Sequence, residues 1–190
     1  MLNLFLTEQY LARQKMKRNI LLKTLIFLLP VILMCNCGGN AENIIIGKAA
    51  PDFTLSDAFG NKYTLSSFRN SNPVVIYFYP KASTPGCTKQ ACGIRDKQDK
   101  FKDNNIIVLG ISVDSKESIK DFIDENSLNF PLLSDEDKEV SKIFGVLNNI
   151  GLDSRITFII DKTGNITNII RDVDVDTHAD DVFDLAVKLR

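Results

Sequence analysis

Two apolar runs dominate the middle of the chain. Residues 74–79 and 106–113 are almost continuously apolar and rich in β-branched and aromatic side chains. Such runs are typical of strands that are buried on both faces. Between them the pattern predicts a helix that starts at Pro85 and turns Ile94 and Phe101 inward. Two buried strands joined by a helix form a βαβ unit, so we expect these strands to lie side by side and parallel.

Strands of alternating pattern flank this unit. A turn at residues 57–62 separates two short alternating segments and predicts an N-terminal β-hairpin. Residues 155–160 and 165–171 predict a second hairpin, with turn residues between them. Residues 130–133 are interpreted as a short connecting segment. The strands of both hairpins can extend the central pair into a larger sheet.

Three further helices follow the second apolar run. Ser115 and Ser134 are predicted to cap the first two, and Thr177 with Asp180 forms the pattern of a capping box that opens the last. Together these elements predict an α/β fold in which a central mixed β-sheet is flanked by helices. We see no internal repeats and no low-complexity tracts.

The N-terminal segment differs from the rest of the chain. Residues 1–35 hold five basic residues and one acid, and residues 24–34 are apolar but too short for a comfortable membrane span. A basic start, a short apolar stretch and then small polar residues are typical of a signal peptide. We therefore predict a leader at residues 1–37, a linker at 38–46 and a domain at 47–190.

Two cysteines end the apolar stretch of the leader. Cys35 and Cys37 stand where a bacterial lipoprotein signal carries the cysteine that becomes lipidated, although neither follows the usual small residue. We expect an exported protein of the cell envelope, either periplasmic or anchored by a lipid on one of these cysteines. The alternatives are a transmembrane tether and a cytoplasmic protein.

Charge and cysteine spacing argue against two classes of function. The net charge is −1, and beyond residue 35 the chain is mildly acidic, which gives no reason to expect nucleic-acid binding. The four cysteines form Cys35-x-Cys37 and Cys87-x₄-Cys92, which do not match the paired CxxC spacing of zinc sites. We expect neither a metal nor a cofactor.

The start of the predicted helix gives Cys87 a distinctive setting. Thr84 can serve as the N-cap and Pro85 as the first helical residue, so Cys87 falls in the first turn. Amide groups without intrahelical partners and the positive end of the helix dipole favour a thiolate there. Cys92 follows five residues later, and in an unbroken helix the two Cα atoms would lie roughly 8–9 Å apart. A disulfide needs less than about 7 Å, so such a bond requires the first turn to unwind.

The sequence around Cys87 resembles an active-site signature of the peroxiredoxins. The string Tyr-Pro-Lys-x-x-Thr-Pro-Gly-Cys-Thr-x-x-Ala-Cys-Gly-x-Arg-Asp, residues 79–96, is similar to their bacterioferritin comigratory protein or PrxQ branch. The resemblance runs from residue 47 to the C-terminus. It implies a thioredoxin-like fold and reduction of hydroperoxides by an attacking cysteine, with recycling by thioredoxin or a thioredoxin-like protein. We expect a monomer.

The resemblance also implies roles for individual residues. Cys87 would be the peroxidatic cysteine and Cys92 the resolving cysteine, joined in an intramolecular disulfide. Thr84 would bond the thiolate and orient the peroxide, and Pro80 would shield the thiolate from water. Arg155, at the start of a predicted strand, would reach the thiolate with a guanidinium that is always charged. Many relatives have a longer loop before this arginine than residues 147–154.

Two other readings of function stay open. A thiol–disulfide oxidoreductase of the envelope usually shows CxxC, whereas this chain has Cys-x₄-Cys. A peroxide-sensing module would be oxidised without turnover. His178, the only histidine, falls in the first turn of the last helix, and we interpret it as structural rather than as a partner of Cys87.

Overall fold

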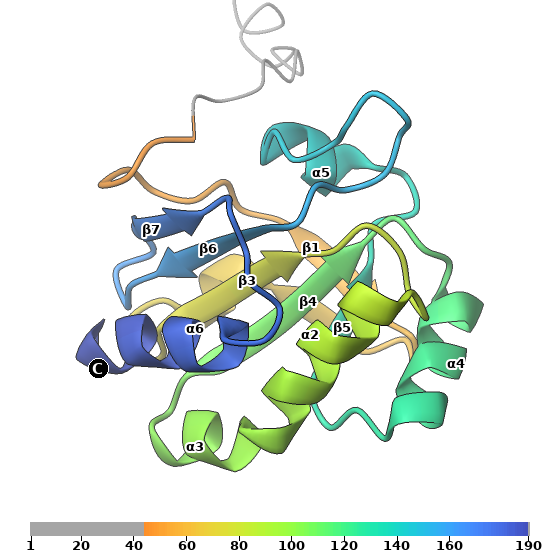
Figure 1. Ribbon diagram of the computed structural model, residues 1–190. Coiled ribbons are helices and arrows are strands. Elements are labelled where there is room, and N and C mark those ends of the chain that lie inside the picture. The colour runs from red at the N-terminus through yellow and green to blue at the C-terminus, as the bar shows by residue number, and fades with distance from the viewer. Residues whose placement is uncertain (1–43, 190) are drawn as a thin grey trace, which may run out of the picture. The chain divides into compact units, whose positions relative to one another are not determined.

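The computed structural model describes residues 44–189. Its central strands and the helix between them lie where the two apolar runs predict a βαβ unit (Figure 1). In chain order the elements are β1 Thr54–Asp57, β2 Lys62–Thr64, η1 Leu65–Phe68, β3 Val74–Phe78, α2 Pro85–Asp96, α3 Gln98–Asp103, β4 Ile107–Ser112, α4 Lys116–Asn126, β5 Leu132–Ser134, α5 Glu139–Ile143, β6 Ile156–Ile160, β7 Ile166–Ile170, α6 His178–Ala186 and η2 Val187–Leu189.

The strands form one mixed sheet in the order β2-β1-β5-β4-β3-β6-β7. As predicted, β3 and β4 pair in parallel, with Val75 opposite Val108. β6 pairs with β3 antiparallel, and Phe78 at the end of β3 lies opposite Ile156 at the start of β6. Antiparallel pairing therefore places the start of β6 beside the C-terminal end of β3. The thiol site described below lies at this end of the sheet.

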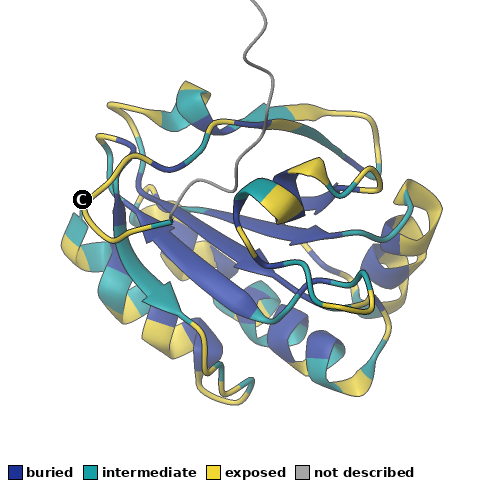
Figure 2. Cartoon of the chain, turned by 90° about the horizontal axis from the view of Figure 1, so that it is seen from above, coloured by how far each residue is buried: buried dark blue, intermediate teal, exposed yellow. Residues whose placement is uncertain are grey.

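Helices cover the two faces of the sheet unequally. α2, α3, α4 and α6 lie on one side, where Tyr77, Ile94 and Phe122 belong to one apolar cluster, and α5 lies on the other, where Phe144 packs with Phe158 (Figure 1). Figure 2 shows that the strands are largely buried and that the exposed residues gather on the outer faces of the helices and in the loops. The predicted α/β fold is confirmed.

Several local predictions are wrong. Residues 132–134 form β5, between β4 and β1, instead of a plain connection. Ser134 therefore lies in a strand, and its hydroxyl donates to the Asp114 carbonyl oxygen. The Asp135 carboxylate caps α5 in its place, accepting from the amides of Val140 and Ser141.

The predicted capping box of the last helix does not form either. The Thr177 side chain makes no capping bond, and its hydroxyl instead donates to the Asp181 carboxylate at 2.7 Å. The predicted cap of α4 is confirmed, because Ser115 Oγ accepts from the Ser118 amide.

The predicted leader, with Cys35 and Cys37, lies outside the described residues. Within residues 44–189 no helix is both long and apolar enough to cross a membrane. In the same part of the chain no group of three or more acidic, histidine or cysteine side chains is arranged to hold a metal ion.

Candidate active site

The first turn of α2 places Cys87 near the C-terminal end of β3. Thr84 is extended, with φ −87° and ψ 148°, and Pro85 opens the helix, as the sequence predicts. The Thr84 side chain makes no capping bond, however, because its hydroxyl donates to the Lys81 carbonyl oxygen at 3.0 Å. Cys87 is only 2% exposed and belongs to the apolar cluster between α2 and the sheet. The sulfur is thus held in a nearly dry position beside the helix N-terminus.

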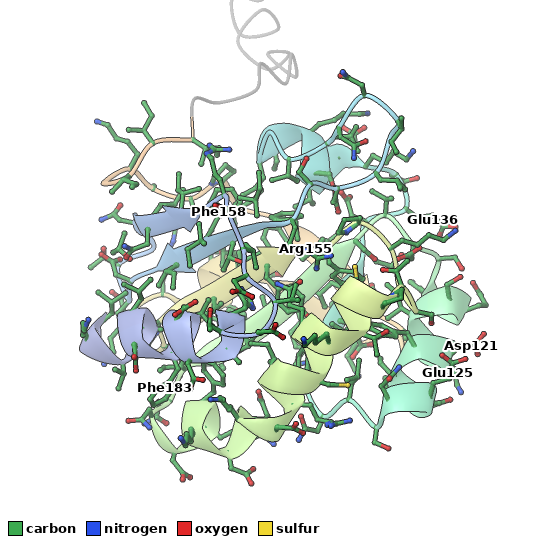
Figure 3. The ribbon with its side chains drawn as sticks, viewed as in Figure 1. Asp121, Glu125, Glu136, Arg155, Phe158 and Phe183 are labelled. Atoms are coloured by element: carbon green, nitrogen blue, oxygen red, sulfur yellow. The ribbon has the colours of Figure 1, made fainter. Side chains whose placement is uncertain are left out.

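Arg155 supplies a positive charge at the Cys87 sulfur. It directly precedes β6 and lies beside the N-terminal end of α2 (Figure 3). Its Nη2 atom is 3.3 Å from Cys87 Sγ. Gly86 allows this approach, since a Cβ at that position would lie 3.3 Å from the same nitrogen. The structure therefore brings together two residues that are 68 positions apart. In the sequence, only the resemblance to the peroxiredoxins suggests that they meet.

Gln90 holds the other side of the guanidinium. Arg155 Nη1 donates to Gln90 Oε1, and Gln90 is 1% exposed. Sequence reasoning missed this residue. The signal was available, because Gln90 stands three positions after Cys87 and so shares its face of the helix.

His178 and Thr157 extend this contact into the core. Gln90 Nε2 lies 3.2 Å from His178 Nδ1, and His178 Nε2 lies 2.9 Å from Thr157 Oγ1. Burial lowers the pKa of His178 to about 4, with a further contribution from Arg155 and an opposing one from Asp181. The imidazole is therefore neutral at neutral pH. Among the described residues, hydrogen bonds connect His178 to Cys87 through Gln90 and Arg155, so the two do not form a dyad.

The loop between β3 and α2 is hydrogen-bonded to the Asp114 side chain. Pro80 follows the end of β3 and is half-buried, and the Ala82 amide donates to Asp114 Oδ2 at 2.7 Å. Ser83 has a positive φ of 55°, which is uncommon for a residue other than glycine. Among the hydrogen bonds of the described residues the Thr84 hydroxyl has none to the Cys87 sulfur. Its predicted part in the site stays a prediction.

Cys92 lies on the same helix but in a different environment. It is half-buried and not bonded to Cys87, and its thiol faces the Asn126 side-chain oxygen at 3.9 Å, at the end of α4. Arg95 Nη1 donates to the Asn126 carbonyl oxygen at 2.6 Å, which ties the last turns of α2 to α4. With both cysteines as free thiols, α2 is an unbroken helix.

The arrangement suits a nucleophilic sulfur. A guanidinium within contact distance and helix-end amides both favour negative charge at the Cys87 sulfur, or on an oxygen that leaves from it. Such chemistry agrees with comparisons to known proteins. A model described as the AhpC/TSA family matches residues 46–169. The chain belongs to the AhpC/TSA family.

Relatives and solved structures narrow its place within the AhpC/TSA family. The chain is 42% identical over 144 residues to Peroxiredoxin Bcp of Escherichia coli strain K12, covering 72% of this chain and 92% of that protein. It is 42% identical over 147 residues to the chloroplastic Peroxiredoxin Q of Sedum lineare, covering 76% and 78%. The crystal structure of Peroxidoxin BcpB from Mycobacterium tuberculosis matches with a TM-score of 0.72 and 34% identity over 78% of this chain and 99% of that one. This AhpC/TSA protein is an enzyme, a peroxiredoxin of the Bcp/PrxQ kind.

Proposed function

We propose that Cys87 reduces hydrogen peroxide and organic hydroperoxides. The Cys87 thiolate attacks the terminal peroxide oxygen, the O–O bond breaks, and a sulfenic acid forms on Cys87. The remaining alkoxide or hydroxide takes a proton and leaves as alcohol or water. The observation that carries this proposal is the Arg155 Nη2 atom at 3.3 Å from Cys87 Sγ, which can stabilise charge on both the attacking and the departing atom.

Pro80 and Thr84 shape the entrance to this sulfur in the proposal. Pro80 shields the thiolate from water, and the Thr84 hydroxyl turns from the Lys81 carbonyl oxygen toward bound peroxide. A Thr84→Val variant keeps the β-branched shape and removes the hydroxyl. We expect Cys87 of this variant to be oxidised more slowly by peroxide. Its free energy of unfolding should change by less than about 1 kcal/mol, because only one partly exposed hydrogen bond is lost.

Cys92 completes the proposed cycle. Its thiol attacks the Cys87 sulfenic acid, a disulfide forms between the two sulfurs, and water leaves. A thioredoxin or thioredoxin-like dithiol then reduces the disulfide by exchange. Since α2 is unbroken with both thiols free, the proposal requires its first turn to unwind during each cycle.

Peroxide consumption with a dithiol reductant tests this function. We expect turnover in the wild type, none in Cys87→Ser, and a single oxidation to sulfenic acid in Cys92→Ser. An envelope thiol–disulfide oxidoreductase would instead reduce insulin disulfides without consuming peroxide. A peroxide-sensing module would be oxidised once and would not turn over with any dithiol reductant.

We further propose that the protein acts in the cell envelope. The support is the signal-like pattern of residues 1–37, with Cys35 and Cys37 at its end. Mass spectrometry of the mature protein from cells gives its N-terminus and any lipid on either cysteine. An intact leader without lipid, recovered from the cytoplasm, would contradict this proposal and leave the peroxidase proposal untouched.

A further inference from the structure

A chain of hydrogen bonds leads away from the thiol site into the core between α2, β6 and α6. It runs from Arg155 Nη1 to the Gln90 side chain, from there to His178, and from His178 to the Thr157 hydroxyl. Gln90, His178 and Thr157 are each no more than 1% exposed. Water can therefore do little to replace a partner that is lost from this chain.

The donors and acceptors of this chain can be assigned by starting from the guanidinium. A guanidinium has only donors, so Gln90 must present its carbonyl oxygen to Arg155. The Gln90 amide nitrogen, a donor, then lies 3.2 Å from His178 Nδ1 and 3.4 Å from His178 Nε2, and we assign the nearer Nδ1 as the unprotonated acceptor. With Nδ1 as the acceptor, the proton of the neutral ring sits on Nε2 and is donated to Thr157 Oγ1 at 2.9 Å.

We infer that His178 is a positioning residue for Arg155, acting through the orientation of the Gln90 amide. An unprotonated Nδ1 can accept a hydrogen bond from the Gln90 amide nitrogen. It therefore favours the orientation in which the Gln90 oxygen faces the guanidinium. A protonated Nδ1 would face another donor. Gln90 would then have to turn its amide around and oppose Arg155 with N–H groups, which would release the guanidinium from Cys87. This inference rests on the proposed role of Cys87 and Arg155.

The surroundings of the ring keep it in the required neutral state. Burial and the nearby Arg155 disfavour the charged imidazole, and Asp181 on α6 favours it. The Tyr77 ring packs against the imidazole with 5.9 Å between centroids and an interplanar angle of 66°. The sum keeps the His178 pKa near 4, far below its usual value of 6.5.

Nuclear magnetic resonance of the imidazole tests the assignment without reference to activity. The chain has one histidine, so an untagged ¹⁵N-labelled protein gives one pair of imidazole nitrogens. At pH 7 we expect a neutral ring protonated at Nε2. In Gln90→Glu a carboxylate oxygen replaces the amide nitrogen, so Nδ1 should gain a proton and the titration midpoint of His178 should rise. A ring protonated at Nδ1 or charged at pH 7 in the wild type would overturn the inference.

Matched variants test the effect on the reaction. His178→Asn keeps an acceptor oxygen where Nδ1 lies, and His178→Leu has a similar volume and no acceptor. We expect oxidation of Cys87 by hydrogen peroxide to slow about fivefold or more in His178→Leu, because small displacements of a catalytic group are costly. His178→Asn should recover most of that loss. Equal rates in the two variants, at equal thermal stability, would contradict a positioning role.

One control separates this inference from the proposed function. Arg155→Gln removes the charge that the chain is said to hold. If Arg155→Gln oxidises as fast as the wild type, the proposed function of Arg155 fails, whatever tautomer His178 shows. If Arg155→Gln is slow while His178→Leu is as fast as the wild type, the proposed function stands and the role of His178 fails.

Discussion

Replacing Gly86 by alanine should separate helix stability from thiol reactivity. The new Cβ would lie 3.3 Å from Arg155 Nη2, closer than side-chain carbons usually approach a neighbour. The same nitrogen lies 3.3 Å from Cys87 Sγ. The guanidinium would have to give way by a few tenths of an ångström, and the direction away from Gly86 is limited by its bond to Gln90.

We expect Gly86→Ala to raise or leave unchanged the stability of the protein and to lower the reactivity of the Cys87 thiol. Alanine is favoured over glycine inside a helix by about 0.5–1 kcal/mol, so the free energy of unfolding should rise or stay unchanged. At an effective dielectric constant of about 20, lengthening a unit-charge contact from 3.3 Å by about 0.3 Å costs roughly 0.4 kcal/mol. That alone slows the reaction about twofold, and rotation of the guanidinium adds to it. We expect a two- to fivefold slower oxidation of Cys87.

Rapid mixing with hydrogen peroxide, acid quenching and mass spectrometry measure the rate. The chain has no tryptophan, so intrinsic tryptophan fluorescence cannot report it. Gly93→Ala, in the same helix as Gly86, is the matched control, because its Cβ would lie 3.6 Å from Ala179 Cβ of α6, which is an ordinary contact. It should gain stability and oxidise at the wild-type rate. Wild-type speed in Gly86→Ala, or equal slowing in both variants, would refute the reasoning.

Three further changes test other parts of the molecule. Gly110→Ala would set a Cβ 2.8 Å from the Tyr77 ring and hydroxyl, so urea denaturation should show a loss of about 2–3 kcal/mol. Burial raises the pKa of Asp153 from 3.8 to about 7, so the folded state binds more protons between these values and stability falls as pH rises. Urea denaturation should therefore show Asp153→Asn gaining on the wild type by roughly 3 kcal/mol between pH 4 and pH 8. Arg95→Ala removes the bond to the Asn126 carbonyl oxygen, so time-resolved alkylation should show faster Cys87–Cys92 disulfide formation.

Local pattern was enough to predict the centre of the fold. The apolar runs at residues 74–79 and 106–113 are long enough for their period to identify β3 and β4, and Pro85 marks the start of α2. β5 was missed because three residues, Leu132–Ser134, are too few to show a period. Its identity as a strand comes from pairing on both sides, which a single stretch of sequence does not display.

For the candidate site too, local sequence predicts some features, whereas others depend on contacts between distant parts of the chain. The first-turn position of Cys87 follows from Thr84 and Pro85 alone. The approach of Arg155 depends on the register between β3 and β6, which only the folded sheet fixes. Gln90 and His178 are 88 positions apart, and neither carries a local signal of the other. The predicted Ser134 cap is wrong for a related reason, since Asp135 reaches α5 from beyond the usual capping position.

The composition of α2 reconciles two demands that oppose each other. The proposed reaction with peroxide needs the start of α2 intact, because Gln90 bonds the guanidinium and Gly86 leaves room for it. The proposed bond between Cys87 and Cys92 needs that turn to open. A glycine stands beside each cysteine, Gly86 and Gly93, and each weakens the helix by about 0.5–1 kcal/mol relative to alanine. Contacts to Arg155, α4 and α6 therefore help to hold the helix, and in the proposed cycle a loss of the guanidinium contact would lower the cost of opening its first turn.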